Sequence, residues 1–158
     1  MTNASSVRNE VSANPFFAGL PSELIDILAA NAVKRHFDRD RTLFHHGETA
    51  DHFYVVLRGR ILIEVAALEG PPLQLQSLDA GAVLGWSWLI PPYKWTFQAR
   101  ADEDADVLEF DGNAIRARCE AKPAFGYELL KRFSGLMSER LHFARQKMMD
   151  EWRPAGFA

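Results

Sequence analysis

The segment of the chain that is richest in candidate binding residues is VLGWSWLIPPYKWTFQA, residues 83–99. It holds three of the four tryptophans of the chain, two adjacent prolines and one lysine, and no acidic residue. The tryptophans are Trp86, Trp88 and Trp95. Aromatic rings with a few polar groups are typical of small-molecule sites. We therefore expect either an aromatic-lined site, with Ser87 and Lys94 as its polar groups, or a site that the three indoles fill themselves.

The other residues capable of chemistry form no catalytic pattern. His45 and His46 are consecutive, so on a strand they point to opposite faces, and His52 does not supply the third converging ligand that a catalytic metal needs. Cys119 has no histidine near it in the sequence and is expected to be a buried, inert thiol. No nucleophile is paired with a base, and no cofactor fingerprint is present. We expect neither an enzyme, a metal site nor a cofactor.

Length and composition favour one cytoplasmic domain. The 158 residues are 47% hydrophobic, and a single cysteine allows no internal disulfide. The formal net charge of −3 does not favour nucleic acid as a partner, and no apolar run is long enough to span a membrane. We expect a flexible polar tail over residues 1–13, one domain over 14–153 and a second tail over 154–158.

The spacing of apolar residues changes along the chain and predicts an α+β fold. After Asn14 the apolar spacing is helical, whereas residues 34–110 alternate and are interrupted by turn sequences such as EGPP and DAGA. In that region FYVVL and ILIEV, joined through Gly59, predict two antiparallel strands. Asp111 opens a short helix that Pro123 closes, and a long helix follows. The expected fold is an antiparallel, jelly-roll-like β-roll of about eight strands with an N-terminal helix and two C-terminal helices.

The long C-terminal helix carries two apolar stripes. The first consists of Leu129, Phe133, Leu136 and Phe143. The second consists of Leu130, Met137, Leu141, Ala144 and Met148. A helix with two apolar faces usually has two partners, and steps of four and three residues are those of a coiled-coil seam. We expect the first stripe to pack on the roll and the second to form a homodimer.

Two glycine-containing motifs resemble the cyclic-nucleotide-binding domain family, which includes catabolite activator protein and the regulatory subunits of cAMP-dependent kinase. The first, G-E-x-x-D-x-x-Y-x-V-L-x-G-x-I, is formed by Gly47, Glu48, Asp51, Tyr54, Val56, Leu57, Gly59 and Ile61. The second, L-x-x-G-x-x-L-G, is formed by Leu78, Gly81, Leu84 and Gly85. The resemblance extends from Phe16 to Met148 and implies a β-roll with a regulatory, non-catalytic role.

The resemblance also implies where a ligand would bind. In that family a cassette of the form F-G-E-x-A-L, followed by P-R-x-A, holds the nucleotide: its glutamate accepts a hydrogen bond from the ribose and its arginine pairs with the phosphate. This chain has Trp86 at the glutamate position and Lys94-Trp95 at the P-R position. The implied site residues are Leu84, Gly85, Trp86, Ser87, Trp88, Leu89, Lys94 and Trp95. Because both nucleotide-pairing side chains are replaced, we expect cAMP and cGMP to bind weakly, and any other small-molecule ligand is unidentified.

Three functions follow from the sequence. The first is a non-catalytic ligand-sensing module of this type, acting through its own dimer or a protein partner. The second is a dimerisation or partner-docking protein whose site is filled. The third, which the lack of three converging ligands disfavours, is a metal-dependent, cupin-like enzyme built on the histidines. In relatives of the catabolite activator type the long helix leads into a DNA-reading helix-turn-helix, and because this chain ends at Ala158 we expect no direct DNA binding.

Overall fold

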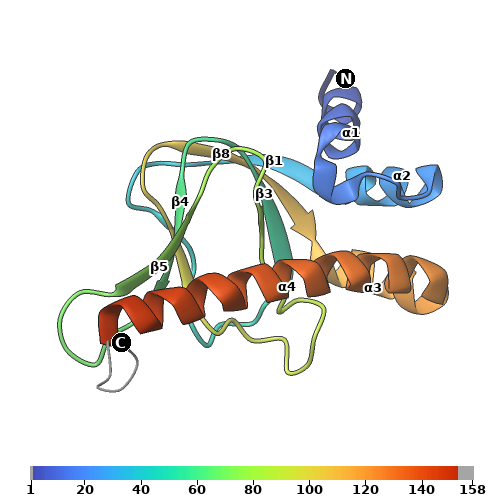
Figure 1. Cartoon of the computed structure of the whole chain (residues 1–158). Coiled ribbons are helices and arrows are strands. Elements are labelled where there is room, and N and C mark those ends of the chain that lie inside the picture. The colour runs from blue at the N-terminus through green and yellow to red at the C-terminus, as the bar shows by residue number, and fades with distance from the viewer. Residues whose placement is uncertain (1, 153–158) are drawn as a thin grey trace.

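Two four-stranded antiparallel sheets face each other in the computed structural model, which describes residues 2–152, and helices cover one end and one side of them (Figure 1). The strands are β1 (Ala32–Phe37), β2 (Thr42–Phe44), β3 (His52–Arg58), β4 (Ile61–Val65), β5 (Leu73–Leu78), β6 (Val83–Leu84), β7 (Gln98–Ala101) and β8 (Ala105–Asp111). The helices are α1 (Thr2–Ala13), the 3-10 turn η1 (Pro15–Phe17), α2 (Ser22–Ala30), α3 (Gly112–Ala121) and α4 (Pro123–Trp152). The predicted α+β roll is confirmed.

The strand order separates two neighbours in the sequence. One sheet runs β1-β8-β3-β6 and the other β2-β7-β4-β5, so β3 and β4 are both strands, as predicted, but do not pair with each other. Gly59, between them, has φ of +87°, and a Cβ there would lie 2.4 Å from the carbonyl oxygen of Asp104. Only glycine fits this conformation and this close approach, which carries the chain from one sheet to the other.

Strand β3 is buried on both faces and divides the interior into two cores. Phe53 and Val55 pack toward the helices, in a core shared with α2, α3 and α4. Tyr54 and Val56 point the other way, into the core enclosed between the two sheets. Side chains that alternate along a strand thus connect the helical layer to the interior of the roll.

The first thirteen residues correct one prediction. The expected flexible tail over residues 1–13 is the helix α1 for its described part, and Val7 and Val11 are 5% and 0% exposed. The two valines are four residues apart and so share one helix face, which packs on the core with α2. Arg8 adds an ion pair to Asp26 of α2 at 2.6 Å. The expected tail over residues 154–158 lies outside the described residues.

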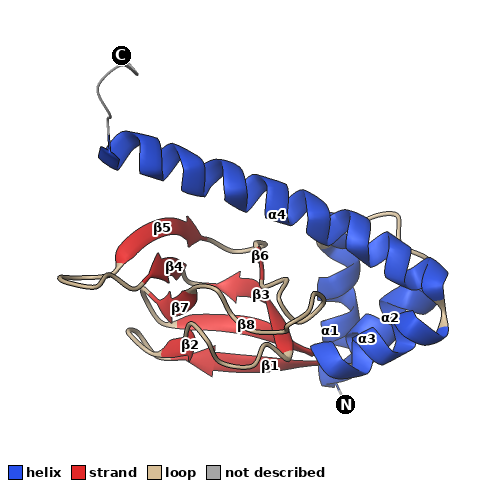
Figure 2. Cartoon of the chain, turned by 90° about the horizontal axis from the view of Figure 1, so that it is seen from below, coloured by secondary structure: helices blue, strands red, loops and turns tan. Residues whose placement is uncertain are grey.

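Helix α4 runs along the roll beside β5 (Figure 2). Leu129, Phe133 and Leu136 of the first predicted stripe are buried against the core, whereas Phe143 is 43% exposed and lines a cavity described below. Within residues 2–152, no helix is long and apolar enough to cross a bilayer.

Candidate functional site

The three tryptophans of residues 83–99 lie in three different environments. Trp88 is fully buried in the core beneath the helices, with its ring centroid 4.9 Å from that of Phe53 and 5.3 Å from that of Phe133. Its indole N–H donates to the carbonyl oxygen of Gly85 at 3.2 Å. Trp88 is therefore a core residue that also fixes the loop after β6.

Trp95 fills the interior of the roll. It is 3% exposed, and its ring stacks on that of Phe44 with centroids 3.7 Å apart and planes 12° from parallel. The indole also covers Gly85, where a Cβ would meet the ring at 2.7 Å. Trp95, which the resemblance predicts at the position of the family's phosphate-pairing arginine, is therefore packed into the hydrophobic core.

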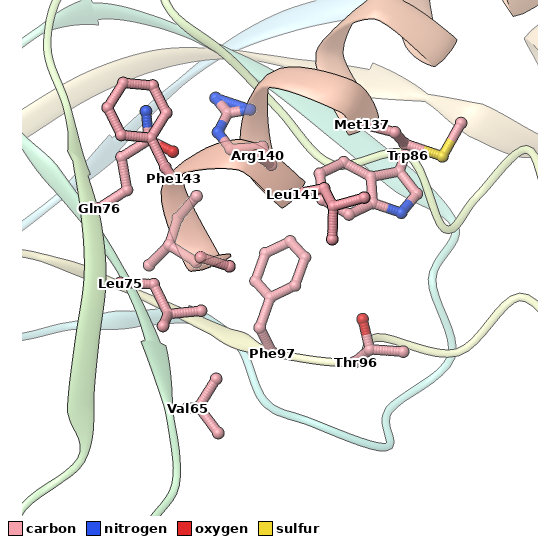
Figure 3. A pocket seen from close by; sticks show the side chains of 12 residues that line it. Val65, Leu75, Gln76, Trp86, Thr96, Phe97, Met137, Arg140, Leu141 and Phe143 are labelled. Atoms are coloured by element: carbon pink, nitrogen blue, oxygen red, sulfur yellow. The ribbon is translucent and has the colours of Figure 1, made fainter. Parts of the chain in front are cut away.

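Trp86 differs from the other two because it borders an open cavity. Its ring lies 5.3 Å from that of Phe97, and both line a cavity of about 360 Å³ between β4, β5 and α4 (Figure 3). A cavity of this size lies at the lower end of the range for small-molecule sites. The lining residues are Ile63, Val65, Leu75, Gln76, Trp86, Thr96, Phe97, Met137, Arg140, Leu141, Phe143 and Ala144.

Arg140 is the charged residue of this lining. It is 7% exposed, and its Nη2 donates to the carbonyl oxygen of Val83 on β6 at 2.7 Å. Burial lowers the pKa of Arg140 to about 10, which leaves the guanidinium charged at neutral pH. The cavity is thus apolar over most of its wall and positively charged at one place.

The remaining predicted site residues do not gather around this cavity. Leu84 and Ser87 are buried, Leu89 packs against the helical core, and residues 87–89 form a turn rather than a helix. Lys94 is exposed, with Nζ 3.5 Å from the hydroxyl of Thr49, and does not line the cavity. Of the eight residues implied by the cassette, Trp86 lines it.

The turn after Trp88 is held in place by an arginine of α3. Arg116 donates from Nη1 to the carbonyl oxygen of Trp88 at 2.5 Å, and its guanidinium stacks over the ring of Tyr93 with 4.0 Å to the centroid. Asn113 accepts a second hydrogen bond from the same guanidinium at 3.2 Å. This contact ties the tryptophan-rich loop to the helices.

The histidines considered for a metal are not brought together. The ring of His45 contacts Glu48 at 3.2 Å, and that of His52 contacts Asp51 at 2.8 Å. Among the described residues, the group with ligand-like spacing is instead formed by His36, Asp38 and Asp104. All three are exposed, and hydrogen bonds or ion pairs within the protein explain their arrangement.

Comparison with known proteins identifies the family. The sequence model of the family described as the cyclic nucleotide-binding domain matches residues 34–122, more than half of the chain. The chain belongs to this family. The match confirms the resemblance carried by the two glycine motifs, and it covers the roll, the tryptophan-rich loop and α3.

Several relatives of known description agree with this assignment. The chain is 22% identical over 134 residues to the CRP-like cAMP-activated global transcriptional regulator of Mycobacterium tuberculosis, covering 85% of this chain and 58% of that protein. It is 25% identical over 144 residues to the anaerobic regulatory protein of Bacillus subtilis, covering 90% of this chain and 59% of that protein. The chain thus spans less than two thirds of the length of these curated relatives.

Solved structures confirm the fold. A putative cyclic nucleotide-binding protein from Geobacter metallireducens superposes with a TM-score of 0.76 at 26% identity, covering 90% of this chain and all of that one. The sensor domain of the transcriptional regulator DNR from Pseudomonas aeruginosa superposes with a TM-score of 0.73 at 17% identity, covering 90% and 95%.

Sequence reasoning missed Arg140, although its position carried a signal. Residues 129, 133, 136, 140 and 143 follow one another in steps of four and three. Arg140 therefore interrupts an apolar stripe that faces the roll. A charged residue inside a buried apolar stripe has to be accommodated by the surrounding structure. The four- and three-residue spacing of the stripe could therefore have identified Arg140 from the sequence.

Proposed function

We propose that this chain is a non-catalytic regulatory module that senses a small molecule bound between the roll and α4. The observation that supports this is the cavity of about 360 Å³, because its walls come from β4, β5 and α4 together. A ligand there contacts the roll and the helix at once, so its binding energy favours the arrangement in which α4 lies against the roll. From the relatives we extend to this chain only a regulatory role.

We further propose that α4 transmits the signal through a homodimer. Met137, Leu141 and Ala144 line the cavity and also belong to the second apolar stripe, whose members Leu130 and Met148 are exposed. A ligand that positions these shared residues changes the surface that a second copy would pack against. Occupation of the cavity and pairing of α4 are thereby coupled.

The first test is a thermal-shift screen of the protein against a panel of small apolar and amphipathic compounds. Thr96→Phe places a ring at the cavity wall and should abolish any shift, whereas Ser138→Phe adds the same ring on the exposed side of α4 and should not. Hydrogen exchange along α4 should slow when a binding compound is added. A panel that never shifts the melting temperature, or a shift that survives Thr96→Phe, contradicts the proposal.

The second candidate function is a dimerisation or partner-docking module without a ligand. The burial of Trp88 and Trp95 favours it, because these two rings fill space rather than line it. In that case the wild-type protein would self-associate or bind a partner equally well with and without every compound of the panel. The screen and a light-scattering measurement together distinguish the two candidates.

A further inference from the structure

The guanidinium of Arg140 is buried at the cavity wall with most of its hydrogen-bonding capacity unused. One bond, from Nη2 to the carbonyl oxygen of Val83, connects it to the roll. Its Nε and Nη1 are shielded from solvent and have no hydrogen-bond partner among residues 2–152. Figure 3 shows the side chain beside the cavity, with Gln76 and Phe143 as neighbours in the lining.

A buried cation in this state requires an anion. Removing a charged group from water without a partner is costly, and buried charges in proteins are normally paired. None of the twelve lining residues is acidic, so the cavity wall supplies no carboxylate. Glu139, next to Arg140 on α4, acts on the guanidinium through its charge, but the hydrogen bond that Arg140 makes goes to Val83 and not to Glu139. The missing partner is therefore expected from a ligand that enters the cavity.

The rest of the lining defines the body of that ligand. Nine of the twelve lining residues are apolar, and Trp86 and Phe97 present two rings. Besides Arg140, the polar residues of the wall are Thr96 and Gln76, whose Oε1 is also buried without a hydrogen-bond partner in the described chain. Such walls favour an apolar ligand with few polar groups.

We propose that the cavity binds a small organic anion with an apolar, flat body, whose acid group pairs with the guanidinium of Arg140. The body then lies against Trp86 and Phe97, and the acid group meets α4 one turn after Leu136. This inference rests on the proposed function and adds the chemical class of the ligand. The anion is held from α4, whereas the cassette segment at residues 84–95 contributes Trp86 as a wall.

The experiment compares two probes that share one body. 2-Naphthoate carries a carboxylate, and 2-naphthalenemethanol is its neutral counterpart; both are titrated into the protein by calorimetry and by quenching of tryptophan fluorescence. A charge-assisted hydrogen bond in a buried site corresponds to about a ten- to hundredfold change in affinity. Naphthoate should bind the wild-type protein tighter than the alcohol by such a factor.

Variants of two arginines on α4 test whether Arg140 causes the preference for naphthoate over the alcohol. Arg140→Met keeps an unbranched apolar stem in place of that of arginine, removes the charge, and should abolish the preference for naphthoate. Arg140→Lys should restore part of it. Arg145→Met removes the same charge from the exposed side of α4 and should leave the preference intact. Melting curves of each variant without probe establish that it is folded.

The outcomes separate this inference from the proposed function. Equal affinities for the two probes, unchanged in Arg140→Met, would leave the cavity as a ligand site but overturn the assignment of an anion. Failure of both probes to bind the wild-type protein would overturn the anion and the ligand site together. A preference for naphthoate that disappears in Arg145→Met, and not in Arg140→Met, would place the anion elsewhere and also overturn the inference.

Discussion

The indole of Trp95 lies directly over Gly85, at a distance that leaves no room for a side chain. A Cβ on Gly85 would stand 2.7 Å from Cη2 and 3.0 Å from Cζ3 of Trp95. The backbone of Gly85 also has φ of +102°, which side chains rarely adopt. These two constraints connect the turn after β6 to the ring that fills the roll.

Gly85→Ala should therefore destabilise the protein by about 2 to 6 kcal/mol, because backbone strain and overpacking each cost about 1 to 3 kcal/mol. Gly81→Ala is the matched control. It has a similar φ of +93°, but a Cβ there meets nothing within 4 Å, so only the strain remains. Urea denaturation of both variants measures the difference. Equal losses would contradict the role of Trp95.

Trp88→Ala should cost about 3 to 5 kcal/mol of stability, the usual range for removing a large buried aromatic side chain. Trp86→Ala should cost less, because Trp86 is only partly buried and borders a cavity. In the naphthoate titration the order should be reversed: Trp86→Ala should weaken the affinity for naphthoate more than Trp88→Ala does. If Trp86→Ala proved as destabilising as Trp88→Ala, Trp86 would be a core residue rather than a cavity wall.

Sequence periodicity predicted which segments form helices and strands better than it predicted which of them pack or pair with one another. The alternation in β3 indicated a strand, yet β3 pairs with β6 and β8, because the conformation of Gly59 carries the next strand into the other sheet. The helix over residues 2–13 was missed because only Val7 and Val11 give it an apolar face, and that face becomes visible through its packing on α2.

The candidate site was only partly predictable for the same reason. The resemblance located the segment at residues 83–99, but three indoles close together in the sequence separate into two cores and one cavity wall. The depth at which each ring lies depends on long-range partners such as Phe44 and Phe53, which a local pattern does not contain.

The second apolar stripe of α4 should mediate a concentration-dependent dimer. Leu130 and Met148 are 44% and 60% exposed and lie outside the cavity lining, so their replacement tests pairing without altering the site. The double variant Leu130→Glu with Met148→Glu should shift the mass from light scattering toward the monomer, because paired helices would place carboxylates of the two copies against each other at two places along the seam. Gln146→Glu, on the exposed opposite face of α4, is the control. A wild-type monomer at every concentration would contradict the dimer.

His36 should titrate above its ordinary pKa of 6.5. Hydrogen bonding of its Nδ1 to Asp106 at 2.6 Å, and of its Nε2 to Asp38 at 3.1 Å, favours the protonated ring and raises its pKa. The stability contributed by this contact is therefore fully present below pH 6.5 and is lost as the pH rises through the higher folded-state pKa. His36 and Arg58 in turn hold the pKa of Asp106 below its usual value.

NMR titration of the His36 ring measures the shift directly. Asp106→Asn should bring its pKa back toward 6.5, because the largest cause of the shift is the hydrogen bond to that carboxylate. Asp79→Asn removes an equal charge, from the ion pair with Arg60, and should leave His36 unchanged. If the pKa of His36 in the wild-type protein were not raised, the exposed pair of His36 and Asp106 would not form in solution.

Cyclic nucleotides should bind at least a hundredfold more weakly than they would to a cassette with its glutamate and arginine intact. The motif resemblance predicts Trp86 at the glutamate position, and its indole N–H can only donate, so it cannot accept from a ribose hydroxyl. The same resemblance predicts Trp95 at the arginine position, and this ring is stacked on Phe44 inside the roll. Two lost charge-assisted hydrogen bonds, at about 1.5 to 3 kcal/mol each, account for a factor of this size or more.

Calorimetric titration of cAMP and cGMP into the wild-type protein tests this expectation, with 2-naphthoate as the comparison ligand. A cyclic nucleotide shares the negative charge that Arg140 can pair with, but the polar residues of the wall beside Arg140 are only Gln76 and Thr96. Its ribose and base would lose hydrogen bonds to water that these two side chains cannot all replace. Submicromolar binding of either nucleotide would contradict the expectation. If Arg140→Met then abolished that binding, the phosphate would pair with α4 instead of the cassette.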